Sequence, residues 1–369
     1  MWRRPLKTII TLMNRGTTRT GGPAIESDAK RMAPIPVSRS RSLLPFLDFG
    51  YRRRMPVDRW LEQCRLPSYL HEDPDSCIAT AARWKCVSLM ARESDTDDLG
   101  LRIAHDSVLD IMGPRVLSGV VREPTLLSGI EAYARLIRGE SSGTIVWPSL
   151  QETTLHFHLK KAFEPGTPGF RQTEWQGLML MVTMIRLFAG REWQPDLMSM
   201  RSSRAIPSLA AELLPDTRFE SGRPSAFLSF PRTLLSTGLS DYGDEVKKSL
   251  PSAPDGPSDA VPTAEFEASL QQILRAYLPE GYPPLSKAAE IAGMSRRTLQ
   301  RRLGENGHTY STLVARTRFD AAVDLLTKTG ATSLEVAMAT GYEDPSHFAR
   351  AFKRIAGCTP REYRSRQAA

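Results

Sequence analysis

The chain has 369 residues, which is too long for one ordinary domain and predicts two folded parts. With 41% hydrophobic and 24% charged residues, its composition excludes a fibrous or wholly disordered protein. The net charge of +8 is uneven: residues 1–54 carry +9, residues 285–366 carry +6, and the rest carries −7. Basic ends around an acidic middle indicate a polyanionic partner, with nucleic acid as the leading candidate.

Residues 1–43 are predicted to be a basic, disordered tail, because residues 17–42 are mostly Gly, Pro, Ser, Thr and Arg with little apolar periodicity. Just beyond this tail, Arg52–Arg54 are either a DNA contact or, by default, a solubilising charge run.

Residues 44–240 are predicted to form an α+β domain. Apolar residues at three- and four-residue spacing predict helices at residues 78–92, 125–138 and 171–189. Alternating β-branched or aromatic residues predict strands at residues 143–147, 154–159 and 226–230.

Two groups of side chains in this domain have alternative interpretations. His156 and His158 share one strand face and either bind a metal or form a polar outer face; we favour the polar face, because no third ligand is near in sequence. Trp147, Trp175 and Trp193 either line a ligand pocket or, as large aromatics more often do, belong to the core.

The cysteines and apolar segments give no sign of a metal site, a disulfide framework or a membrane anchor. The four cysteines form no C-x-x-C pair, which fits a reducing cytoplasm. The longest apolar stretch, residues 178–190, is interrupted by Arg186 and is shorter than the roughly 20 residues that a bilayer requires. We therefore expect a cytoplasmic protein with no metal and no cofactor.

Residues 241–262 are predicted to be a linker, since Pro, Gly, Asp and Ser dominate there. Residues 263–369 are then predicted to be an all-α domain, with helices at residues 265–278, 285–292, 296–305, 310–328, 334–340 and 345–356. Expected N-caps are Ser295, Ser333 and Asp344, and expected terminating glycines are Gly330 and Gly357.

The stretch from Ala288 to Leu303 has the pattern of a helix-turn-helix unit: a short helix of small residues, a turn at Gly293 and a second helix. Leu299 and Leu303 are expected to face inward. This leaves an outward stripe of Arg297, Gln300 and Arg301. Arg and Gln can make paired hydrogen bonds to guanine and adenine in the major groove.

The same pattern recurs at residues 336–342 followed by residues 345–356, where Phe348 and Phe352 are expected to face inward. The helix between the two units, residues 310–328, would be about 28 Å long. Such a spacer would hold two recognition helices roughly one DNA turn, about 34 Å, apart. The polar positions of the second recognition helix are Ser346, His347, Arg350, Lys353 and Arg354.

With these motifs, residues 263–366 resemble the AraC/XylS-type transcriptional regulators. The resemblance rests on the tandem units, on the connecting helix with Arg318, Ala322, Leu325 and Leu326, and on a closing run of spaced residues. That run comprises Gly341, Tyr342, Ser346, His347, Phe348, Phe352, Lys353, Gly357, Thr359, Pro360, Tyr363 and Arg364.

The middle domain is similar to the effector-binding half found in the arabinose-binding-like branch of that family. The similar segments are Asp98–Arg102, Gln172–Gly190, Trp193–Pro195 and the strand ending at Phe230. The resemblance does not cover the basic extension of some 40 residues.

The resemblance implies a transcription factor that binds double-stranded promoter DNA sequence-specifically and responds to a small-molecule effector. A contact with RNA polymerase is also expected, and a homodimer is left open. The implied base-reading residues are Arg297, Gln300, Arg301, Ser346 and Arg350, with Arg296 beside them. The implied phosphate contacts are Lys353, Arg354 and Arg364. His347 is either a DNA contact or a surface residue that supports Phe348.

Two other classes of function are weighed against a regulator. A DNA-tethered enzyme is disfavoured, because the chain has no G-x-S-x-G motif, P-loop, dinucleotide fingerprint or metal cluster, and we assign no catalytic residue. A nonspecific DNA-coating protein would bind all sequences equally, whereas the Arg/Gln stripe predicts base discrimination.

Overall fold

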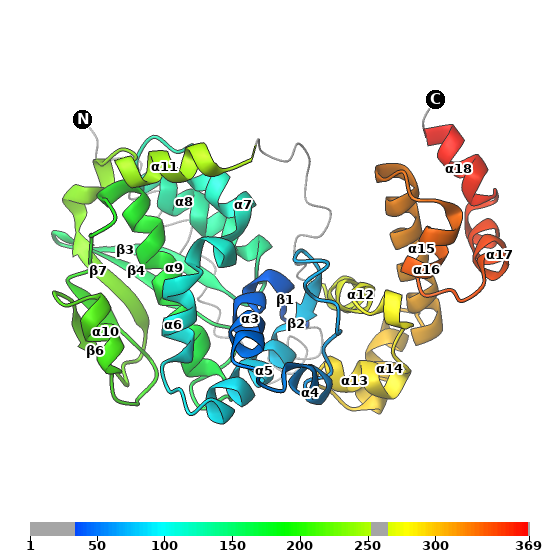
Figure 1. Ribbon diagram of the computed structural model, residues 1–369, viewed down its shortest axis with the longest axis horizontal. Coiled ribbons are helices and arrows are strands. Elements are labelled where there is room, and N and C mark those ends of the chain that lie inside the picture. The colour runs from blue at the N-terminus through cyan, green and yellow to red at the C-terminus, as the bar shows by residue number, and fades with distance from the viewer. Residues whose placement is uncertain (1–33, 252–264, 368–369) are drawn as a thin grey trace.

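The computed structural model describes residues 34–251 and 265–367, which form two lobes (Figure 1). The larger lobe combines helices with a five-stranded sheet, and the smaller lobe contains helices alone. The predicted fold class, an α+β domain followed by an all-α domain, is confirmed.

The elements of the larger lobe are, in chain order, β1 (Val37–Arg39), η1 (Ser40–Ser42), α3 (Leu44–Arg52), α4 (Val57–Gln63), β2 (Cys77–Ala79), α5 (Thr80–Glu93), α6 (Leu99–Asp106), α7 (Val108–Val120), α8 (Leu126–Leu136), η2 (Ile137–Gly139), β3 (Ile145–Gln151), β4 (Thr154–Lys160), α9 (Phe170–Ala189), β5 (Leu197–Ser199), α10 (Ser208–Leu213), β6 (Arg218–Glu220), β7 (Ala226–Pro231), η3 (Arg232–Ser236) and α11 (Asp241–Ser249).

Those of the smaller lobe are α12 (Phe266–Arg275), η4 (Leu278–Glu280), α13 (Leu285–Ile291), α14 (Arg296–Glu305), α15 (Tyr310–Lys328), α16 (Ser333–Ala339), α17 (Pro345–Ala356) and α18 (Pro360–Gln367).

The sheet has the strand order β3-β4-β7-β5-β6, and only the β5–β6 pair is parallel. Its inner face is apolar because alternate residues of β4 and β7 point the same way; Leu155, Phe157 and Leu228 are all buried. On the outer face, His158 pairs across the strands with Trp147 and stacks on it at 4.9 Å. The histidine pair therefore belongs to an aromatic outer face.

Helix α9 is the centre of the larger lobe. Apolar residues occur all round it, so it is buried on nearly every side, as a helix hydrophobic on all faces must be. It packs against α5, α6, α7, α8 and α11 and against β7. Trp175 on this helix is fully buried, as expected of a core aromatic.

Two expectations about the chain's organisation need correction. Residues 37–39 were expected in a disordered tail, yet they form β1, which pairs with β2 and buries Val37. The linker was expected to begin at residue 241, yet residues 241–249 form α11, whose Val246 is buried. In both cases the partner is distant in sequence: β2 for β1, and α9 for α11.

Most of the predicted caps in the smaller lobe are confirmed. Ser295 and Asp344 cap α14 and α17 with their side chains, and Gly357 ends α17 in the left-handed conformation. Ser333 was predicted to be the N-cap of α16, but Thr332 has this role, in a capping box with Glu335.

Most buried apolar residues of the described ranges belong to one of two separate clusters. The larger, here called the shared core, runs without a break from the sheet domain into α12, α13, α14 and the start of α15, where it includes Leu313. The smaller, here called the terminal core, consists of Ala322, Leu326, Val336, Ala337, Phe348 and Phe352. Helix α15 contributes to both clusters, so it joins the two helix-turn-helix units.

Lys161 directly follows β4 and lies against α9, where a β-carbon on Gly177 would approach its Nζ to 2.7 Å. Burial lowers the pKa of Lys161 to about 7, and the nearby Arg83 guanidinium acts in the same direction, against the opposite effect of Glu174. The charged form of this side chain is therefore disfavoured by folding.

We predict that Lys161→Met raises the melting temperature at pH 7 and that this gain shrinks toward zero by about pH 10. Between pH 7 and the ordinary pKa of 10.5, the unfolded chain holds a proton that the folded chain releases, so the contribution of Lys161 to stability rises with pH in this window. Thermal unfolding at several pH values measures the difference from wild type. The exposed neighbour Lys160, changed to Met, is the control; an equal gain at both pH values would contradict the prediction.

Candidate nucleic-acid interface

The first helix-turn-helix unit consists of α13 and α14. Ala288, Ala289 and Ile291 of α13 are buried, and small side chains there allow α14 to pack closely. Gly293 occupies the turn with a φ of 67°, a conformation that side-chain-bearing residues rarely adopt. Ser295 then begins α14 by accepting a hydrogen bond from the Thr298 amide at 3.1 Å.

Helix α14 divides into a buried and an exposed face. The predicted inward residues Leu299 and Leu303 are buried, at 0% and 1% exposure. The predicted DNA contacts on this helix are all exposed: Arg296, Arg297, Gln300 and Arg301. The Arg301 guanidinium is paired with Glu305, one turn along the helix, at 2.6 Å. An exposed ion pair of this kind contributes little energy and is easily exchanged for a stronger acceptor.

Arg302, next to this stripe, is turned toward the protein. Its guanidinium lies over the Phe266 ring of α12, 4.9 Å from the centroid, and burial lowers its pKa. Arg302 therefore fastens α14 to α12, a role that its place in the arginine run did not reveal.

The second unit consists of α16 and α17 and has the same design. Phe348 and Phe352 are buried at 2% each, as predicted, and Asp344 caps α17 by accepting from the Ser346 amide at 2.6 Å. This hydrogen bond to the carboxylate lowers the pKa of Asp344. The predicted DNA contacts on α17 are all exposed: Ser346, His347, Arg350, Lys353 and Arg354. The ring of His347 lies 3.9 Å from the Asp344 carboxylate.

Arg318 of α15 holds the two units in a fixed relation. Its guanidinium donates to the carbonyls of Thr340, at 2.8 Å, and Gly341, in the turn of the second unit. It also stacks on Tyr342, 3.4 Å from the ring centroid, and faces Tyr282 of the first unit at 5.3 Å. In the sequence, Arg318 was noted only as part of a family resemblance. Its hydrogen-bonding role could not be predicted, because its acceptors are backbone carbonyls, which no sequence motif identifies.

A close backbone approach reinforces this contact. Gly341 has a φ of 77°, and a β-carbon at this position would lie 2.5 Å from the carbonyl oxygen of Leu278 in η4. Glycine is therefore required at this position for two reasons: the positive φ of the turn, and the close approach of the Leu278 carbonyl, which leaves no room for a β-carbon.

Arg364 does not lie with the exposed candidates. It is only partly exposed, and its guanidinium donates to the carbonyl of Leu326, at 3.1 Å, and to that of Ala331. These bonds fasten α18 to the end of α15 and to the loop that follows. Sequence alone could not separate this role from a phosphate contact, since Arg suits both.

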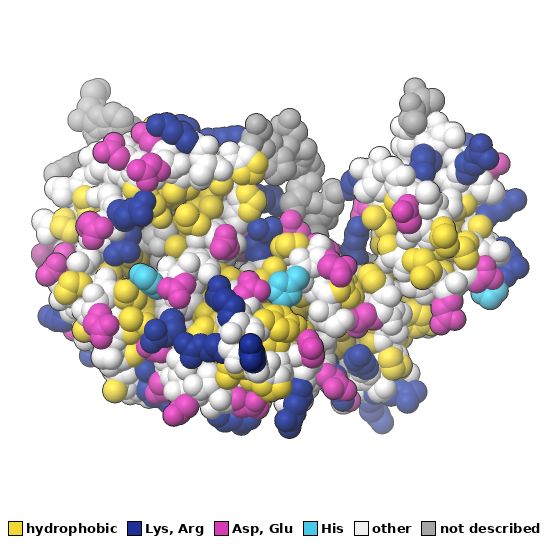
Figure 2. Space-filling model, viewed as in Figure 1, with side chains coloured by type: hydrophobic (Ala, Val, Ile, Leu, Met, Phe, Trp, Pro, Cys, Tyr) yellow, Lys and Arg dark blue, Asp and Glu magenta, His cyan; other side chains and the backbone are white. Residues whose placement is uncertain are grey.

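Basic side chains lie at both ends of the smaller lobe. Figure 2 shows Lys and Arg over α13 and α14 at its lower end and over α17 and α18 at its right-hand edge. Helix α15, with 19 residues, joins these ends and is about 28 Å long.

The smaller lobe contacts the larger one through the segment that follows α12 and through α13. Tyr277 donates from its hydroxyl to the Arg65 carbonyl at 2.5 Å, and Tyr69 donates to the Ala276 carbonyl. Arg65 also pairs with Glu290 of α13 at 3.1 Å. These contacts were not foreseen from the sequence, because their partners lie more than 200 positions apart along the chain.

The remaining candidate features of the chain concern metal ligands, cysteines and apolar helices. Within the described ranges, no three His, Cys, Asp or Glu side chains are grouped to hold a metal ion. All four cysteines are unpaired and buried. No helix of the described part is both long enough and apolar enough to cross a bilayer.

Two helix-turn-helix units with exposed basic recognition helices, on the end of an α+β domain, define a DNA-binding protein of the two-domain regulator type. Comparison with known families agrees. Residues 288–366 match the model of a helix-turn-helix domain, and residues 55–239 match that of the arabinose-binding domain of AraC transcription regulators.

Several individual proteins are similar to the chain. The HTH-type transcriptional regulator VirS of Mycobacterium tuberculosis is 26% identical over 313 residues, which cover 83% of this chain and 90% of VirS. The ornithine utilization regulator of Pseudomonas aeruginosa is 35% identical over 100 residues, 27% of this chain and 30% of that protein. The crystal structure of the regulator CdpR from Pseudomonas aeruginosa aligns over 86% of this chain and 98% of its own, with 18% identity and a TM-score of 0.37.

The chain belongs to the AraC family of transcriptional regulators, since the arabinose-binding model of that family alone matches about half of it. It is accordingly a DNA-binding transcription regulator with an effector-type domain ahead of its helix-turn-helix domain.

We predict that Arg364→Ala destabilises the second unit by about 2 kcal/mol, because two carbonyls lose a charged hydrogen-bond donor. Amide hydrogen exchange of α17 and α18 measures the loss. The control is Arg366→Ala on the exposed side of α18. Equal effects of the two changes would contradict the positioning role, as would full recovery of protection by Arg364→Lys, which keeps the charge but not the two-pronged geometry.

Proposed function

We propose that the protein binds promoter DNA sequence-specifically, with α14 and α17 in successive major-groove segments on one face of the duplex. The observation that carries this proposal is the same division on both helices: apolar residues are buried on one side, and Arg, Lys, Gln and Ser are exposed on the other. A helix of about 28 Å between the units suits a separation of roughly one DNA turn.

Within this proposal each exposed residue has a role. The base-reading residues are Arg297, Gln300 and Arg301 in the first unit and Ser346 and Arg350 in the second, because Arg and Gln fit the donor and acceptor patterns of base edges. Arg296 and His347, which lie near the starts of their helices, contact DNA beside them. Lys353 and Arg354 contact phosphates from the last turn of α17.

Arg364 receives a different role from the one first expected. With its donors directed at two backbone carbonyls, we assign it to positioning α18 and the second unit rather than to phosphate binding.

We further propose that residues 44–240 sense a small molecule and thereby modulate DNA binding. The match of residues 55–239 to an arabinose-binding domain supports this. The proposal has four remaining parts. The protein has a regulatory rather than a catalytic role, and it is located in the cytoplasm, where promoter DNA lies. It contacts RNA polymerase, and it forms a homodimer.

The test of DNA recognition is selection of genomic fragments by the purified full-length protein, followed by titration of variants on the best fragment and on a scrambled one. Arg301→Ala is expected to relax base preference at one position by about 1–3 kcal/mol. Lys353→Ala is expected to weaken binding to both fragments alike and to reduce the salt slope by about one.

The control for charge alone is Lys247→Ala, an exposed change on α11 in the larger lobe. Equal losses from Arg301→Ala and Lys353→Ala on both fragments would contradict the assigned roles. The wild-type protein is also titrated in the presence and absence of small molecules extracted from cells. If it binds the selected and the scrambled DNA equally under both conditions, sequence-specific recognition itself is overturned.

A further inference from the structure

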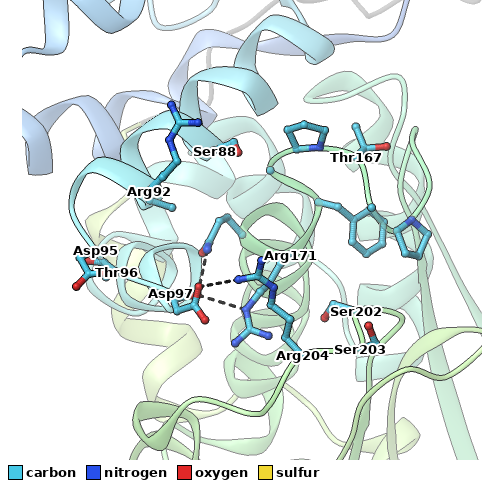
Figure 3. Close-up of a pocket in the computed structure, with 17 residues that line it drawn as sticks. Ser88, Arg92, Asp95, Thr96, Asp97, Thr167, Arg171, Ser202, Ser203 and Arg204 are labelled. Carbon is cyan, nitrogen blue, oxygen red and sulfur yellow. Dashed lines mark hydrogen bonds and ion pairs between the residues drawn. The ribbon is translucent and has the colours of Figure 1, made fainter.

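A cavity of about 540 Å³ lies at the start of α9, in the larger lobe (Figure 3). Its walls come from the end of α5, the Asp95–Asp97 loop, the Pro165–Gly169 loop, the first turn of α9 and the Ser202–Arg204 loop. A volume of this size lies within the range of small-molecule sites, and it is formed by five segments that only the fold brings together.

The cavity is positively charged. Arg92, Arg171 and Arg204 line it together with Asp95 and Asp97, so the charged side chains sum to +1. Figure 3 shows Arg171 and Arg204 both directed at Asp97.

These arginines are unequally engaged. Arg204 pairs with the Asp97 carboxylate at 3.1 Å, whereas Arg171 donates to two backbone carbonyls, those of Asp97 at 3.3 Å and Ala205 at 2.8 Å. Among the described residues, no carboxylate lies within ion-pair distance of the Arg171 guanidinium. Arg92, an exposed residue of α5, has no side-chain hydrogen bond or ion pair with any described residue.

The start of α9 adds to this positive field. Its N-cap is Gly169, and no side chain caps the helix. The N-terminus of a 20-residue helix carries a partial positive charge, although the amide of its first residue, Phe170, already donates to the Thr167 carbonyl at 3.0 Å. Gly169 cannot be replaced by a capping residue, because its φ is 85° and a β-carbon would lie 2.3 Å from the Trp84 carbonyl oxygen.

A buried hydroxyl in the cavity wall is without a hydrogen-bond partner. Ser202 is 8% exposed, and its Oγ has no partner among the described residues. The buried Glu174 holds this loop in place by accepting from the amides of Arg201, at 2.8 Å, and Ser202, at 3.1 Å. An unpartnered buried hydroxyl costs free energy, which a ligand in the cavity would recover.

We propose that this cavity binds the carboxylate of a small organic acid and is the effector site of the regulator, an inference that rests on the proposed sensing function. Arg171, Arg92 and the start of α9 bind the carboxylate, and Ser202 donates to it. Phe170, Ala91 and Pro168, which also line the cavity, accommodate a short apolar portion of the ligand.

The cavity is linked to the DNA-binding lobe by α5, by the adjoining strand β2 and by α12, against which β2 packs. Helix α5 lines the cavity with Ser88 and Arg92 near its end, and β2 directly precedes its first residue. Strand β2 in turn packs against α12, and the Ile35 amide beside β1 donates to Ser269 of α12 at 3.1 Å. Because α12 and α14 belong to the shared core, a shift of α5 reaches the first recognition helix.

The experiment measures thermal unfolding of the full-length protein with sodium acetate, succinate, citrate or inorganic phosphate, against sodium chloride of equal ionic strength. At least one carboxylate is expected to raise Tm by roughly 2–4 °C near saturation. Arg92→Gln and Ser202→Ala remove no bond within the described protein. With either variant, about ten times more carboxylate is expected to be needed for the same Tm shift. Arg232→Gln, an exposed change away from the cavity, is the control and keeps the full effect.

DNA binding is then titrated with and without the active carboxylate on the selected fragment. A change in affinity of about 5- to 150-fold that Arg92→Gln abolishes supports the effector assignment. Carboxylate binding without any change in DNA affinity would overturn that assignment, and a variant-dependent response to phosphate alone would overturn the ligand class. Absence of a variant-dependent Tm shift with every probe would overturn the site. The thermal measurement contains no DNA. Failure of the carboxylate site can therefore be distinguished from failure of sequence-specific DNA recognition.

Discussion

The rest of the structure depends on one packing constraint: the first helix-turn-helix unit has no apolar core of its own. Leu299 and Leu303 of its recognition helix are buried in the same continuous cluster as the sheet domain, to which α12 forms the bridge. A helix pair this small cannot bury enough apolar surface alone, so it is stabilised by the neighbouring domain. Helix α14 therefore belongs to the same packed cluster as the larger lobe, and on the proposed sensing function a ligand in that lobe acts on α14 through this packing.

The second unit is attached differently. Its buried apolar residues form a separate six-residue cluster with two residues of α15, and the unit meets the first one through α15, through Arg318 and at Gly341. Arg318 acts on two carbonyls and two tyrosine rings at once, so it restricts rotation as well as separation of the units. Helix α15 and the contacts of Arg318 together hold the two units at a fixed spacing. The proposed simultaneous contact with two groove segments requires such a spacing.

The sequence predicted those features whose causes are local. Ser295, Asp344 and Gly357 mark helix ends by their own chemistry, and the apolar spacing of α14 and α17 showed which face is buried. Features set by distant partners were missed. Helix α11 lies in a polar stretch, and its Gly243 is explained only by the Leu187 carbonyl, 2.2 Å from where a β-carbon would lie. Arg302 and Arg364 have the same side chain as the candidate DNA contacts, and only their surroundings reveal the difference.

The division into two cores also bears on how the protein leaves its DNA. Because six buried residues hold the second unit and a far larger cluster holds the first, we expect the carboxyl-terminal unit to open locally at the lower free energy. On the proposed binding mode, we therefore expect dissociation to begin at α17 while α14 still contacts the DNA. On the same proposal, the stability of the terminal core affects how long the protein stays on its DNA, separately from the base-reading residues that decide which sequence is bound.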